Sequence, residues 1–208
     1  MRRFALAFAA ALLSAQPLFA APSTYSAADR AELDRVSAYL NSIRTMKGGF
    51  VQIDPNGDVD QGNFDISKPG RMRFEYKPPA PTLIVSDGKT VAVANTQLKT
   101  IDSYPLDQTP LDLILGDSID LAGSHEIVGV ARQQDSFIVK ARSRGGRAQG
   151  NITLTFSEPE LELRQWTVID NQGLSTTVAL RNVQTGIDIP ASLFVLPDKA
   201  ALKPKPND

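Results

Sequence analysis

The 208-residue chain has no cysteine and only one histidine, His125. Without cysteine there are no disulfides, so packing and backbone hydrogen bonds must stabilise the fold, and a lipid cannot be attached through a thiol. A serine hydrolase needs a base poised near neutral pH, and the sequence around His125, AGSHEIVG, lacks the pattern of a nucleophile elbow. We expect His125 to be structural and the protein not to be an enzyme.

Other patterns of chemical sites are missing as well. The five aspartates between residues 102 and 120 lack the alternate-position spacing of a calcium loop. Glu158, Glu160 and Glu162 alternate with leucines, which favours a solvent-facing strand over a glycosidase pair. The glycine-rich residues 144–150 precede no helix and so form no phosphate loop. The sequence therefore predicts no metal and no cofactor.

Long apolar runs are rare, and the one present opens the chain. Arg2 and Arg3 precede a run from Phe4 to about Ala15, and small residues follow at Ala20, a pattern typical of a secretory signal peptide spanning residues 1–20. The run is shorter than the roughly 20 residues that a membrane-spanning helix needs. We expect an exported protein.

The charge balance argues against one class of partner. Removal of residues 1–20 takes away two arginines and no acidic group, which leaves 20 basic and 23 acidic residues. Because this net charge of about −3 does not favour phosphate backbones, we expect no binding to nucleic acid. Residues 21–197 are enough for one domain with a substantial core, and the Pro- and Lys-rich residues 198–208 are expected to form a loose tail.

An amphipathic helix is predicted at residues 26–46. Its apolar residues recur every three or four positions: Leu33, Val36, Leu40, Ile43 and Met46. Ser26 and Asp29 form a plausible capping pair, and we expect Gly48 and Gly49 to end the helix.

Beyond this helix the apolar residues alternate, which predicts about ten short strands from Phe50 to Leu196. Turn sequences separate them, at residues 56–57, 87–88, 145–146 and 171–173. A meander of this length predicts one curved antiparallel sheet. The first helix and a short helix within residues 108–117 carry apolar faces and are expected to cover its concave side, and residues 189–194 are expected to form a single helical turn.

The segment GRMRFEY, residues 70–76, raises the question of function. Met72, Phe74 and Tyr76 share one side of the predicted strand, whereas Arg71 and Arg73 are expected on the convex, solvent-facing side. The apolar three either belong to the core or line a cavity for a hydrophobic ligand. Periodicity alone leaves both interpretations open.

The order of six segments along the chain distinguishes these two interpretations. The segments are GGFVQ (48–52), GNFDISKPGRMRFEY (62–76), PTLIVSDGKTV (81–91), LDQTPLDLIL (106–115), GLSTTVALRNVQTG (173–186) and IPASLFVL (189–196). This series resembles the LolA family of periplasmic outer-membrane lipoprotein carrier proteins. The resemblance runs from the first helix nearly to the end of the chain. Its most specific part is KPGRMRFEY followed by LIVSDGK.

The resemblance implies a mainly β fold with some α: an open antiparallel half-barrel whose lid of short helices covers an apolar cavity. It implies a periplasmic chaperone that takes acylated lipoproteins from an inner-membrane ABC-type releasing complex and hands them to an outer-membrane acceptor. One-to-one transfer of cargo would suit a monomer. A carrier or sensor of free lipid or another amphiphile on the same fold stays open as the alternative.

The resemblance also assigns residues to roles. The concave sheet face would carry Phe50, Met72, Phe74 and Tyr76, and the lid would carry Leu111, Ile114 and Leu115. In the family an arginine just before the strand proline holds the lid shut through lid backbone, and here Lys68 precedes Pro69. Because lysine offers a point charge in place of a planar fork, we expect a weaker lid lock at Lys68 or a lock elsewhere.

Overall fold

The computed structural model describes residues 25–142, 150–198 and 202. The expected signal peptide, the turn at residues 145–146 and most of the expected tail lie outside these residues. Within the tail, Leu202 is buried. None of the described helices is long and apolar enough to cross a membrane.

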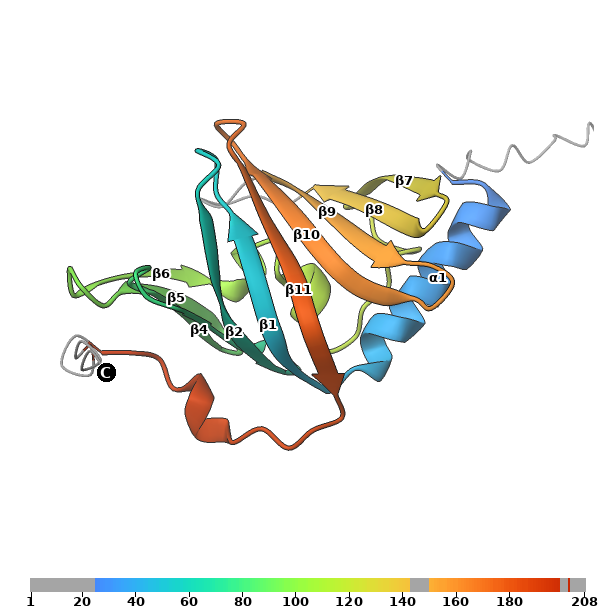
Figure 1. The fold of residues 1–208 in the computed structure, drawn as a ribbon. Helices are drawn as coiled ribbons and strands as arrows, with labels where there is room; N and C mark the ends of the chain where they lie inside the picture. Colours follow the sequence, from blue (N-terminus) through green and yellow to red (C-terminus); the bar gives the residue numbers. More distant parts are fainter. Residues whose placement is uncertain (1–24, 143–149, 199–201, 203–208) are drawn as a thin grey trace, which may run out of the picture.

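Eleven antiparallel strands form one sheet in the order β6-β5-β4-β3-β2-β1-β11-β10-β9-β8-β7 (Figure 1). The strands are β1 Thr45–Ile53, β2 Val59–Ser67, β3 Arg71–Tyr76, β4 Thr82–Asp87, β5 Thr90–Asn95, β6 Thr100–Pro105, β7 Ile127–Gln133, β8 Ser136–Arg142, β9 Gly150–Ser157, β10 Glu162–Asp170 and β11 Ser175–Thr185. β6 and β7 are separate edges, so the sheet is open. The predicted curved antiparallel sheet is confirmed.

Four helical pieces accompany the sheet: α1 Ala27–Ser42, η1 Leu106–Gln108, α2 Asp112–Leu115 and η2 Ala191–Phe194. α2 lies within the curve of the sheet and α1 runs across the half formed by β7–β10 (Figure 1). Between them, residues 116–124 pack Ile119 and Leu121 into the core. We call α1, residues 116–124 and α2 the helical cover.

The start of α1 is as predicted, because Ser26 and Asp29 form a complete capping box. The predicted end is wrong. Ile43 is already extended and β1 begins at Thr45, so Gly48 and Gly49 lie inside a strand. Pairing of β1 with both β2 and β11 outweighs the helical spacing of Ile43 and Met46, which still reach the core.

The convex face differs in part from expectation. Arg71 and Arg73 do point away from the core side of β3, but η2 covers them. The Arg71 guanidinium lies 5.8 Å from the ring centre of Phe194, and Arg73 Nη1 donates to Leu193 O at 3.5 Å. Phe194 is buried as a result, so this row is a packing surface for the C-terminal segment.

Gly62 on β2 tolerates no side chain. A Cβ there would lie 2.2 Å from Glu75 O and 2.6 Å from Phe50 Cε1, so backbone and ring would both have to shift. We expect Gly62→Ala to lower the free energy of unfolding by about 1–3 kcal/mol, measured by urea denaturation. Gly129→Ala is the matched control, since a Cβ there meets open space and the change should stay within about 0.5 kcal/mol. Equal losses in both variants would contradict the steric argument.

Candidate functional site

The concave face of the sheet is centred on a cluster of aromatic rings. The Phe50 ring lies 5.0 Å from Phe74 and 4.9 Å from Tyr76, between centroids. Phe64 stacks on Phe74 at 5.5 Å, and Trp166 meets Phe74 edge-on at 5.9 Å. Strands β1, β2, β3 and β10 therefore contribute one continuous apolar surface.

Tyr76 marks the polar end of this cluster. Its hydroxyl donates to Gln52 Oε1 at 2.6 Å, and burial raises the pKa of Tyr76 to about 12. The phenol therefore stays neutral at physiological pH. Met72, on the same face, is also buried.

Of the three residues expected on the lid, Ile114 and Leu115 lie in α2 and Leu111 directly precedes it. Ile114 and Leu115 are buried and Leu111 is half-buried against the core. Gly70 N donates to Leu115 O at 2.8 Å, which ties the end of α2 to the turn before β3. The tether uses backbone atoms, so no side-chain pattern indicates it.

Two side chains of α1 fasten the helix to residues 116–124. Asn41 donates to Ile119 O at 2.8 Å and accepts from Ile119 N at 2.9 Å. Ser37 Oγ accepts from Leu121 N at 2.9 Å. These hydrogen bonds join α1 to Ile119 and Leu121 of the helical cover.

Lys68 lies under α1, and its side chain is hydrogen-bonded there rather than to α2. Only 7% exposed, it donates from Nζ to Leu40 O at 2.9 Å, in the last turn of α1, where carbonyls lack helical partners. Burial, reinforced by Arg44, lowers the pKa of Lys68 from its ordinary 10.5 to about 8, while Asp117 opposes the shift. The ammonium is hydrogen-bonded but costly to bury.

The space between Lys68 and the apolar residues around it is small. The space lined by Leu40, Ile43, Met46, Ile66, Lys68, Ile114 and Leu163 has a volume of about 10 Å³. That is room for no more than about one water molecule. An alkyl chain could enter here only if the helical cover moved.

Other residues of this surface were not singled out from the sequence. Phe64 follows the alternation of its strand, but nothing in that pattern separates a central ring from an ordinary core position. Trp166 was hidden because an extra residue, Arg164, interrupts the alternation of β10. Among the described residues no group of three or more His, Cys, Asp or Glu side chains could hold a metal ion.

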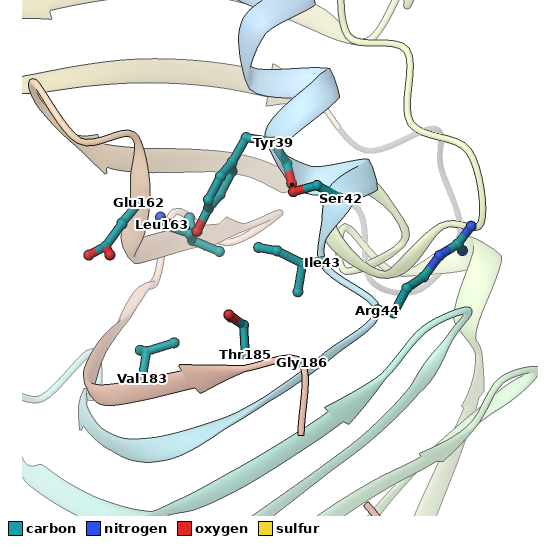
Figure 2. Close-up of a pocket in the computed structure, with 9 residues that line it drawn as sticks. All are labelled: Tyr39, Ser42, Ile43, Arg44, Glu162, Leu163, Val183, Thr185 and Gly186. Atoms are coloured by element: carbon teal, nitrogen blue, oxygen red, sulfur yellow. Dashed lines mark hydrogen bonds between the residues drawn. The ribbon is translucent and has the colours of Figure 1, made fainter. Parts of the chain in front are cut away.

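A larger pocket opens beside the end of α1 (Figure 2). Its volume is about 420 Å³, and its lining residues are Tyr39, Ser42, Ile43, Arg44, Glu162, Leu163, Val183, Thr185 and Gly186. They come from α1 and the residues just after it, from β10, and from the end of β11. The lining combines apolar side chains with polar ones.

Comparison with known proteins gives a family model that covers most of the chain. The model of the outer membrane lipoprotein carrier protein LolA matches residues 41–197. An outer-membrane lipoprotein carrier protein of Chromohalobacter salexigens is 29% identical over 206 residues, covering 93% of each chain. One from Azotobacter vinelandii is 27% identical, covering 90% of this chain and 92% of that one. A solved domain from Vibrio parahaemolyticus shares the fold at 8% identity and a TM-score of 0.50, over 86% of this chain and 100% of that one.

Proposed function

The chain belongs to the LolA family of outer-membrane lipoprotein carrier proteins, and from this we propose a periplasmic chaperone that shields the acyl chains of lipoproteins. It would receive cargo from an inner-membrane ABC-type releasing complex, carry it as a one-to-one complex and deliver it to an outer-membrane acceptor. The family is one of carriers, and the proposed work needs no covalent step.

The observation that supports this function best is the apolar surface between the sheet and the helical cover. Burial of an acyl chain is worth about 0.8 kcal/mol per methylene, so a sixteen-carbon chain would lose roughly 12 kcal/mol on entering water. Rings from four strands belong to the same buried apolar cluster as Ile114 and Leu115 of α2. Such a surface could replace the membrane interior as a solvent for the chain.

The closed packing suggests how cargo could also be released. The apolar face of the sheet is buried against the helical cover, so an acyl chain would have to compete with the cover for the same face. Loading would shift the equilibrium toward an open state and unloading would let the cover return. We propose that Lys68, through Leu40 O, and Gly70, through Leu115 O, hold the closed state.

Spheroplasts that retain newly made lipoproteins test the function. The purified protein should release these lipoproteins as soluble one-to-one complexes. Leu115→Glu should abolish release because it places a carboxylate on the apolar side of α2, whereas Leu98→Glu, at a 70% exposed position, should not. Release of no lipoprotein, with phospholipid bound instead, would favour a free-lipid carrier.

A further inference from the structure

Strands β10 and β11 separate at one end of the sheet. They pair only from Gln165 opposite Ala179 to Ile169 opposite Ser175, yet β10 begins at Glu162 and β11 continues to Thr185. Over these outer residues each strand keeps its other neighbour, β9 or β1. Figure 1 shows β10 and β11 diverging toward the end of α1. The sheet is therefore split within its middle, away from its two edges.

Bulges in both strands shape this split. In β10 the extra residue is Arg164, which leaves Leu163 and Trp166 both facing the core. In β11 the pairing with β1 shifts at Gly48, which is opposed by two residues, and one of them, Asn182, has a φ of 50°. Because of the shift, Val183 and Thr185, and not Asn182 and Gln184, lie on the same side as the buried Met46, the partner of Thr185. Bulges commonly re-aim side chains beside functional sites.

The 420 Å³ pocket occupies this split and falls within the range of about 300–1,000 Å³ typical of ligand sites. In Figure 2 the side chains of Tyr39, Ile43, Leu163 and Val183 gather around it, while the Arg44 guanidinium extends away. The apolar part therefore suits hydrocarbon. Glu162 and Ser42 add polar groups for the part of a ligand that stays in water.

Two side chains separate this pocket from the packed interior. Ile43 and Leu163 line both the pocket and the 10 Å³ space beside Lys68. Ile43 follows the last residue of α1, and Leu163 lies on β10, so the partition belongs to two elements that can part. It would open if the last turn of α1 moved away from β10.

We propose that this split is the portal through which an alkyl chain of the cargo enters and leaves the interior, an inference that rests on the proposed carrier function. Tyr39 is its latch. Leu163 N, beside the bulge, donates to the Tyr39 hydroxyl at 3.0 Å, and the Tyr39 ring stands edge-on to Phe156 at 6.0 Å. The Lys68 contact to Leu40 O lies at the same end of α1.

Plugging the portal tests the proposal. Val183→Trp and Thr185→Trp place a large ring in the split, and Val128→Trp adds the same ring at a 50% exposed position on β7. Stopped-flow fluorescence follows uptake and release of cis-parinaric acid by the purified protein. Because a portal lowers the barrier in both directions, each plugged variant should show association and dissociation rates reduced about tenfold with a nearly unchanged Kd.

Loosening the latch should have the opposite effect. Tyr39→Phe removes the hydroxyl that accepts from Leu163 N and should speed both association and dissociation. Tyr25→Phe is the control: it removes the hydrogen bond from Tyr25, just before α1, to Ile127 O and should change neither rate. Normal uptake by the wild type with unchanged rates in both plugged variants would overturn the portal alone. A wild-type protein that takes up no cis-parinaric acid would overturn the carrier function and the portal together.

Discussion

Phe74→Ala should lower the free energy of unfolding by about 3–5 kcal/mol, and a fatty acid should restore part of that loss. Phe74 is 5% exposed and its ring contacts Phe50, Phe64 and Trp166, so truncation leaves an apolar cavity among rings. Such cavities stay dry and bind apolar molecules. If this surface receives acyl chains, palmitate should fill the space that Phe74 vacates. Urea denaturation with and without palmitate measures both effects.

Phe194→Ala is the matched control for rescue. It removes an equally buried ring, but one that packs under Arg71 on the convex face, outside the proposed cavity. Phe194→Ala should also lower the free energy of unfolding substantially, but palmitate should stabilise this variant no more than it stabilises the wild type. Equal rescue of both variants would show non-specific binding, and no rescue of Phe74→Ala would place Phe74 in a core that lipid does not reach.

Alternation of apolar residues was enough to predict the sheet, because most strands have one face on the core; the edge strand β6 has no buried residue. Segments such as Phe137, Val139 and Ala141 obey it without interruption. The end of α1 could not be predicted in this way, since Ile43 and Met46 satisfy helical spacing and strand burial alike. Only the pairing of β1 with two neighbouring strands decides between these conformations.

The candidate site was harder to predict for two physical reasons. Met72, Phe74 and Tyr76 face the interior as expected, but the same burial serves a core and a closed cavity, so the pattern is silent on their role. The split between β10 and β11 depends on bulges at Arg164 and Asn182, and a bulge erases the period on which strand prediction relies. The sequence pattern therefore could not predict Val183 and Leu163 as residues of the proposed portal, and the structure was needed to find them.

The lid lock at Lys68 remains a proposal whose chemistry differs from that of the family arginine. Its partner is Leu40 O in α1, whereas α2 is tied through Gly70 N. The Lys68 ammonium is a point charge that donates to Leu40 O, whereas a guanidinium would offer a planar fork of donors. Unlike arginine, lysine can also lose its charge near physiological pH when buried.

Stability between pH 8 and 10.5 should reveal this buried charge. Burial lowers the pKa of Lys68 to about 8 in the folded protein, against 10.5 when unfolded. Within this window the unfolded chain binds a proton that the folded protein lacks, so stability should rise with pH, by up to about 3 kcal/mol. Below pH 8 the charged form is present in both states and the full burial cost applies.

Other groups also titrate at high pH: the raised pKa of Tyr76, for example, makes stability fall as pH rises above 10. Two substitutions isolate the contribution of Lys68 from theirs. Lys68→Met keeps the length of the side chain without a titrating group, and Lys68→Arg keeps a charge that does not titrate below pH 12. Urea denaturation from pH 7 to 10.5 should show that the free energy of unfolding of the wild type rises relative to that of both variants. Parallel curves for all three proteins would mean that Lys68 has the same pKa in the folded and unfolded protein, so its ammonium would be as well solvated when folded as when unfolded. That result would contradict a buried ammonium held on Leu40 O.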